Sequence, residues 1–168
     1  GGTIKSAGAR AADLGAQIPE TWVDDIYAAM FERLGEVVEL VPGVLSVLDA
    51  LDAADIPHAV GSNGPMAKME VTLKRTKIWD RLFPAIYTAY DCAAPKPAPD
   101  VYLKAAQIAG VDPADCVVIE DSASGATAAK AAGMRCFGFF AETPREKLSP
   151  LVDVLFDDMA DLPVHLGI

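Results

Sequence analysis

The chain has 168 residues, of which 52% are apolar, and its formal net charge is −10. A chain of this length is typically one domain with a sizeable core, and its apolar content excludes an intrinsically disordered protein. The acidic balance argues against nucleic acid and anionic membranes as partners, although local cations can still attract a phosphorylated substrate into one cleft.

The cysteines and the apolar runs indicate the compartment. Cys92, Cys116 and Cys136 are odd in number and widely spaced, which favours reduced thiols in a cytosolic protein. There is no run of about 18 apolar residues, and no basic-then-apolar leader precedes the first helix. We therefore expect a cytoplasmic protein without a membrane partner, and the sequence carries no signal of its oligomeric state.

Residues 3–40 are predicted to form helices only. The first helix ends at Gly15, and the second opens at residues 19–21 with apolar residues at helical spacing. We expect Trp22 and Met30 on this stripe to be core residues and not cofactor contacts; the stripe comprises Trp22, Val23, Ile26, Tyr27, Met30, Phe31 and Leu34. A break at residues 41–44 predicts a boundary between a helical unit, residues 1–41, and a second unit, residues 42–168.

Strands alternate with helices from residue 45 onward. Apolar runs predict strands near residues 56–61, 85–89, 116–119, 134–140 and 152–156. Helical patterns lie near residues 45–54, 67–76, 101–109 and 122–133, the last begun by Ser122 or Ser124 and ended by Gly133. This alternation predicts βαβ units and therefore an α/β fold with a parallel sheet.

Polar residues follow the strand that ends at Gly61. Ser62, Asn63 and Gly64 come directly after it and precede a helix. Backbone N–H groups and the Ser62 hydroxyl at such a place can hold a phosphate oxygen. An ordinary serine or asparagine cap is the alternative interpretation.

Two more candidates are a lysine and a pair of carboxylates. Lys96 stands between Pro95 and Pro97, which stiffen the loop and present the ammonium group from it. Glu120 and Asp121 follow a buried strand, and adjacent hard oxygen ligands at the end of a strand suit Mg²⁺. The alternative is a solvated turn in which Asp121 merely caps the next helix.

A hydroxyl, a lysine and a carboxylate pair in this order, each after a strand, resemble the haloacid dehalogenase superfamily of phosphohydrolases and phosphomutases. The resemblance covers about residues 42–140 and implies a Rossmann-like parallel sheet. It also implies a role for each matching residue: binding of the transferred phosphoryl group by Ser62 with Asn63 and Gly64, charge compensation by Lys96, and binding of Mg²⁺ by Glu120 and Asp121.

The helices before residue 42 look like the second half of the α-helical cap that these enzymes insert after their first strand. In the subgroup similar to β-phosphoglucomutase and its phosphatase relatives, a loop of the cap reads the substrate. Residues 1–5 lie where that loop would fall, and the resemblance therefore suggests Lys5 as a substrate contact.

The family's nucleophile is the first aspartate of an Asp-x-Asp motif, and this sequence contains no Asp-x-Asp. The chain therefore looks truncated inside the cap, and we expect it to be close to inactive alone because nothing can form the aspartyl-phosphate. In the family the first strand lies between the strand ending at Ser62 and the one ending at Glu120. We expect two unpaired strand edges there, unless the sheet closes up or pairs between chains.

The resulting prediction is a Mg²⁺-dependent phosphatase or phosphomutase that acts on a small phosphorylated metabolite of the sugar phosphate type. One alternative is a 2-haloacid dehalogenase, which residues 62–64 favour, although Glu120 and Asp121 would repel its carboxylate substrate. The other is a non-catalytic, truncated remnant that oligomerises or binds a partner.

Overall fold

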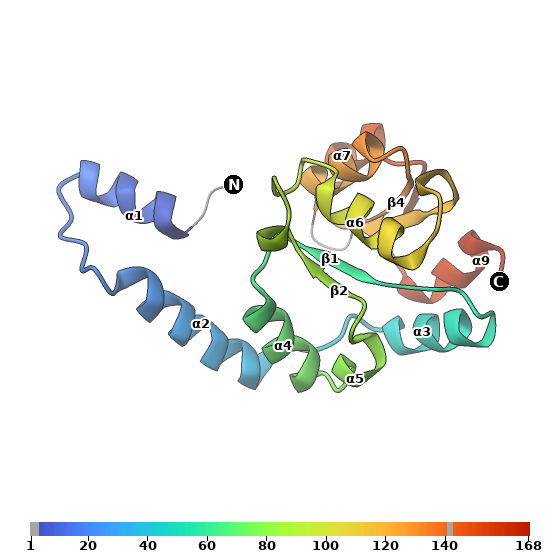
Figure 1. Ribbon diagram of the computed structural model, residues 1–168, viewed down its shortest axis with the longest axis horizontal. Helices are drawn as coiled ribbons and strands as arrows, with labels where there is room; N and C mark the ends of the chain where they lie inside the picture. The colour runs from blue at the N-terminus through green and yellow to red at the C-terminus, as the bar shows by residue number, and fades with distance from the viewer. Residues whose placement is uncertain (1–3, 141–142) are drawn as a thin grey trace.

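The computed structural model describes residues 4–140 and 143–168, with side chains from Ala7 onward (Figure 1). Two helices, α1 (Ile4–Asp13) and α2 (Trp22–Val37), extend away from the body as an arm. Trp22 and Met30 of α2 were expected in the core, and that expectation is wrong, because α2 has no buried residue. Its main neighbours are α1 and α4 (Met66–Arg75), which cover only part of its surface.

The body of the molecule alternates strands and helices in the predicted order. The strands are β1 (Val60–Ser62), β2 (Ile86–Thr88), β3 (Val117–Glu120), β4 (Arg135–Phe139) and β5 (Val154–Phe156). The remaining α-helices are α3 (Val44–Ala53), α5 (Trp79–Leu82), α6 (Asp100–Ala109), α7 (Ala123–Ala131), α8 (Arg145–Leu148) and α9 (Leu162–Leu166). The sequence did not predict α5, α8 and α9, because helices this short show little periodicity.

The strands form two parallel sheets rather than one. β1 pairs with β2, and β3, β4 and β5 pair in that order. Within the described part of the chain, β1 and β3 therefore each have one free edge, and no strand lies between them. This confirms the expected pair of unpaired edges.

Helices cover both faces of the sheets, which gives three layers (Figure 1). On one face, α7 packs on β3 and β4 while α6 packs on β1 and β2, and both helices share a cluster that includes Val101, Val118, Ala126 and Cys136. On the other face, α3 and α9 pack on aromatic residues of β4 and β5. The α/β class with a parallel sheet is thereby confirmed, and all strands end on the same side of the molecule.

Two further observations concern thiols and membranes. Cys92, Cys116 and Cys136 are free cysteines. None of the described helices has the length and apolar character needed to cross a membrane.

Candidate functional site

Ser62 ends β1 and begins a loop that the neighbouring strand holds in place. The Gly64 N–H donates to Ser62 Oγ over 3.0 Å, so the Ser62 hydroxyl accepts this bond and keeps its own proton for another partner. Thr88, the buried last residue of β2, donates from its hydroxyl to the Gly64 carbonyl over 2.7 Å. The loop is therefore tied to the strand beside it.

The side chain of Asn63 is hydrogen-bonded to the backbone of the loop that carries Lys96. Its Oδ1 accepts a hydrogen bond from the Lys96 backbone N–H over 2.8 Å, and its Nδ2 donates to the Lys96 carbonyl over 3.1 Å. Both ends of the amide are thus occupied by one residue that lies 33 positions away. In this arrangement the Asn63 side chain positions Lys96, whereas the sequence predicted a phosphate contact.

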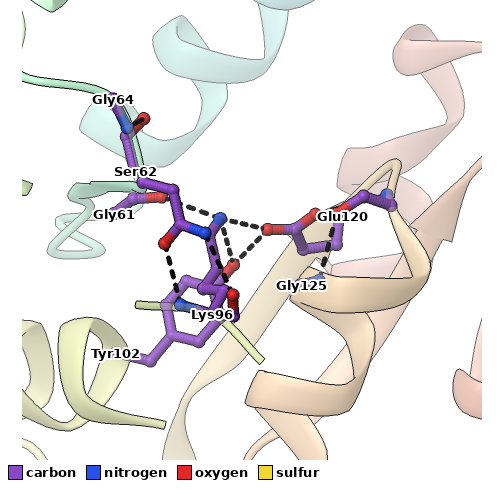
Figure 2. A network of polar contacts seen from close by, with 9 residues as sticks. Gly61, Ser62, Gly64, Lys96, Tyr102, Glu120 and Gly125 are labelled. Carbon is purple, nitrogen blue, oxygen red and sulfur yellow. Dashed lines mark hydrogen bonds and ion pairs between the residues drawn. The ribbon is translucent and has the colours of Figure 1, made fainter. Parts of the chain in front are cut away.

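The Lys96 ammonium group lies between the ends of β1 and β3 (Figure 2). Its Nζ donates to the Gly61 carbonyl over 3.2 Å, to the Tyr102 hydroxyl over 3.1 Å and to Glu120 Oε1 over 2.6 Å. These bonds use all three N–H donors of the ammonium group. The longest of them lies on the β1 side.

Glu120 is 7% exposed, and both of its carboxylate oxygens accept hydrogen bonds. Its Oε1 accepts from Lys96 and from the Tyr102 hydroxyl, while its Oε2 accepts from the backbone N–H and the hydroxyl of Ser122. Burial by itself would raise the pKa of Glu120, but the charge of Lys96 and these hydrogen bonds lower it below its ordinary value. The carboxylate is therefore ionised at neutral pH.

Tyr102 is the residue in this network that the sequence did not predict. It projects from α6, is 8% exposed, and donates its hydroxyl to Glu120. Burial and the neighbouring charge of Glu120 raise its pKa, so the hydroxyl stays protonated. A buried tyrosine needs a partner for its hydroxyl, but the sequence alone does not identify the partner.

The first turn of α7 lies directly against the Glu120 carboxylate. Ser122 is the N-cap, because its Oγ accepts from the Gly125 N–H over 3.0 Å, which decides between Ser122 and Ser124. A Cβ atom on Gly125 would lie 1.9 Å from the Glu120 carboxyl carbon, so only glycine allows this approach. Asp121 is exposed, and the interpretation of Asp121 as the cap is wrong.

The oxygens of Glu120 and Asp121 are the candidate metal ligands. No group of three or more histidine, cysteine, aspartate or glutamate side chains that could hold a metal occurs among the described residues. Mg²⁺ is commonly held by one or two carboxylates together with substrate phosphate oxygens. Hard oxygen donors bind Mg²⁺ in preference to softer metals. The hard oxygen donors of Glu120 and Asp121, adjacent at the end of β3, therefore fit Mg²⁺.

The structure joins Lys96 to Glu120 and to the carbonyl of Gly61, the residue before Ser62, and Asp121 is the next position after Glu120. The side chain of Lys5, the expected substrate contact, lies outside the part that the structure describes.

Known proteins resemble this chain in sequence and in structure. Protein CbbY of Rhodobacter capsulatus is 32% identical over 130 residues, which are 73% of this chain and 57% of that protein. Hexitol phosphatase A of Escherichia coli (strain K12) is 32% identical over 145 residues, which are 82% of this chain and 65% of that protein. The chain thus spans less than two thirds of either relative.

A solved structure shares the fold over nearly the whole chain. The HAD family hydrolase of Deinococcus radiodurans R1, with bound phosphate and sodium, is 28% identical with a TM-score of 0.81, and the match covers 99% of this chain and 76% of that one. Residues 5–133, most of the chain, match the family described as haloacid dehalogenase-like hydrolase. By this match, and with its parallel sheet and the site at the ends of its strands, the chain belongs to the haloacid dehalogenase-like hydrolase family.

Proposed function

We propose that this chain carries the phosphate-binding and metal-binding residues of a Mg²⁺-dependent phosphatase or phosphomutase. The observation that carries the proposal is the position of Lys96 Nζ, 3.2 Å from the carbonyl of Gly61 and 2.6 Å from Glu120 Oε1. One cation thereby joins the end of β1 to the carboxylate of Glu120 at the end of β3. A phosphate ester bound between them would meet a hydroxyl, an ammonium group and carboxylates.

Each residue has a distinct role in this proposal. Ser62, with the backbone of Asn63 and Gly64, binds oxygens of the phosphoryl group, and Lys96 offsets its negative charge. Glu120 and Asp121 hold Mg²⁺, which supplies charge neutralisation at the phosphoryl oxygens when it is bound. The Asn63 side chain holds the backbone of Lys96 and so keeps the ammonium group in place.

Small phosphorylated metabolites of the sugar phosphate type are the proposed substrates. Hexitol phosphatase A, a relative, is named for an activity of this class. Phosphatases and phosphomutases share the chemistry at the phosphoryl group, so the proposal covers both. The alternative 2-haloacid dehalogenase receives no support from the site, because the Asn63 amide is bound to Lys96 and adjacent carboxylates repel an anionic substrate.

The proposal includes low activity of this chain by itself. The sequence contains no Asp-x-Asp, and no aspartate among the described residues forms an ion pair or hydrogen bond with Lys96. Without a carboxylate nucleophile at the site, no aspartyl-phosphate forms. Binding of phosphate and of Mg²⁺ depends less on that carboxylate than formation of the aspartyl-phosphate does. Binding can therefore be measured on this chain.

The first test is binding of inorganic phosphate in the presence of Mg²⁺, followed by isothermal titration calorimetry. Ser62→Ala should weaken binding about tenfold, because it removes a hydrogen bond to a charged group that contributes roughly 1.5 kcal/mol. Asp121→Asn should abolish the enhancement of phosphate binding by Mg²⁺. Asp80→Asn, an exposed aspartate on α5, is the matched control.

A phosphatase assay completes the test. This chain should hydrolyse sugar phosphates at close to the background rate, and a longer form that supplies an Asp-x-Asp strand should hydrolyse them with Mg²⁺. In that longer form, Lys96→Ala should lower the turnover number by about 100-fold or more, because it removes charge stabilisation in the transition state. Full activity with excess chelator would overturn the metal assignment.

A further inference from the structure

Tyr102 contacts both charged partners of the site, although no role follows for it from the sequence. Its hydroxyl donates to Glu120 Oε1 and accepts from Lys96 Nζ over 3.1 Å (Figure 2). Its ring also lies under the ammonium group, with Nζ 5.1 Å from the ring centroid. The ring reaches this place because Gly61 has no side chain: a Cβ atom there would lie 3.1 Å from Tyr102 Cε1.

The two oxygens of Glu120 have different surroundings. Oε1 is held on the side of Lys96 and Tyr102, while Oε2 is held by Ser122, the residue that follows Asp121. The hydroxyl of Tyr102 therefore helps to fix which oxygen of the carboxylate lies beside the turn that carries Asp121. The ammonium group of Lys96 alone fixes it less well, because its flexible stem allows it to follow a rotating carboxylate.

We propose that Tyr102 is a positioning residue that orients Glu120 for a divalent cation shared with Asp121. The proposal rests on the proposed function, which assigns Glu120 and Asp121 as metal ligands. Tyr102 does not touch the cation; it acts through the hydrogen bond to Oε1. Hydrogen-bond partners of this kind orient the ligands of metal sites, and their loss typically lowers metal affinity about 10-fold to 100-fold.

Tyr102→Phe removes only the hydroxyl and keeps the packing of the ring. Lys96 then loses one acceptor and Glu120 Oε1 loses one donor, so Oε1 keeps only its bond from Lys96. The carboxylate gains freedom to rotate, and binding of a cation has to remove that freedom again. The dissociation constant for Mg²⁺ should therefore rise.

The test is a Mg²⁺ titration of this chain followed by the NMR signals of the Asp121 and Ser122 amides. Tyr102→Phe should raise the dissociation constant about tenfold. Tyr87→Phe is the matched control, because Tyr87 packs against the same core cluster and its hydroxyl has no hydrogen-bond partner among the described residues. This control should bind Mg²⁺ like the wild type.

The outcomes separate this inference from the proposed function. Wild-type binding that Asp121→Asn abolishes and Tyr102→Phe leaves unchanged would overturn the role of Tyr102 and retain the metal site. A wild-type chain that gives no Mg²⁺-dependent shift at Asp121 would overturn the metal site and the role of Tyr102 together.

A second measurement needs no variant of Tyr102 and keeps the inference testable if Tyr102→Phe unfolds. The buried hydroxyl proton of Tyr102 should give a slowly exchanging signal in the wild type. This signal should shift with Mg²⁺ at the same midpoint as the Asp121 amide. A hydroxyl signal that stays in place through saturation would contradict the inference, because an orienting bond to a metal ligand must sense the metal.

Discussion

Lys96 and Glu120 depend on each other because both are buried. The side chains are 12% and 7% exposed, and their charged atoms lie 2.6 Å apart. Removing one partner of such a pair leaves a buried charge without compensation, which typically costs about 3–5 kcal/mol. Burial acts to raise the pKa of Glu120, and the charge of Lys96 is the largest of the effects that lower it. The same pair therefore links the stability of the fold to the charge of the site.

The stability of Lys96→Met should depend on pH in the opposite direction to that of the wild type. In the wild type the pKa of Glu120 is lowered by folding, so its contribution to stability is present above the unfolded pKa of about 4.3 and lost as the pH falls further. In the variant, burial raises the pKa of Glu120, so this contribution is present at acidic pH and lost as the pH rises.

Urea unfolding of both proteins measures this difference. At pH 7 we expect Lys96→Met to lower the free energy of unfolding by about 3 kcal/mol, and the loss should shrink as the pH approaches about 4.3. Lys74→Met is the control, because Lys74 forms an exposed ion pair with Glu70 on α4. An equal loss for Lys96→Met at every pH would contradict the coupling to Glu120.

At the scale of elements, the contact between the end of β3 and the start of α7 shapes the site. Glu120 ends the strand, Ser122 caps the helix, and Gly125 lets the helix approach the carboxylate. The N-terminus of a helix carries a partial positive charge, which favours a carboxylate at this place. The positions of these residues explain why the acidic pair is followed by a helix rich in small residues.

Gly125→Ala should disturb both stability and metal binding. The added Cβ atom would overlap the Glu120 carboxylate, which has to move away from Ser122. Overpacking of this kind typically lowers the free energy of unfolding by about 1–3 kcal/mol. The affinity for Mg²⁺ should fall as well, as measured by the same NMR titration.

Gly35→Ala is the control for this substitution. Gly35 also lies within a helix, α2, and an added Cβ atom would meet only Val71 at an ordinary 3.7 Å. Alanine is favoured over glycine inside helices by about 0.5–1 kcal/mol, so this variant should be more stable than the wild type. A wild-type affinity for Mg²⁺ in Gly125→Ala would show that Glu120 does not need its observed position.

At the scale of the whole molecule, β1 and β3 each have an edge without a partner strand among the described residues. The Val60 N–H donates to the Ala85 carbonyl, so Val60 faces β2 and Gly61 faces the free edge. The Cys116 carbonyl accepts from Arg135, so Val117 and Ile119 face the free edge of β3. Unpaired strand edges are places where another strand can pair.

Amide hydrogen exchange should reveal these edges. The amides of Gly61, Val117 and Ile119 should exchange faster than those of Val60 and Val118, which face a paired strand. The measurement is made by NMR at low protein concentration. Equal protection of both groups would contradict free edges in solution and would indicate that they pair, for example with a second copy of the chain.

Much of this protein follows from its sequence, because short-range patterns carry the information. The alternation of apolar runs and helical patterns predicts the parallel α/β fold, and the prolines around Lys96 predict a stiff loop. Lys96 binds Gly61 near the end of β1 and Glu120 at the end of β3 because parallel strands end at one edge of a sheet. The shortest helices and the exposure of α2 were not predictable from these patterns.

Only the tertiary structure decided which side chains complete the site. Tyr102 and Glu120 lie 18 positions apart, and Asn63 and Lys96 lie 33 positions apart, so no local pattern connects them. Their contacts depend on how α6 packs against β1 and how closely α7 approaches β3. The sequence determined which chemical groups are present at the strand ends, whereas packing determined their partners, because hydrogen bonds depend on distances that only the folded chain sets.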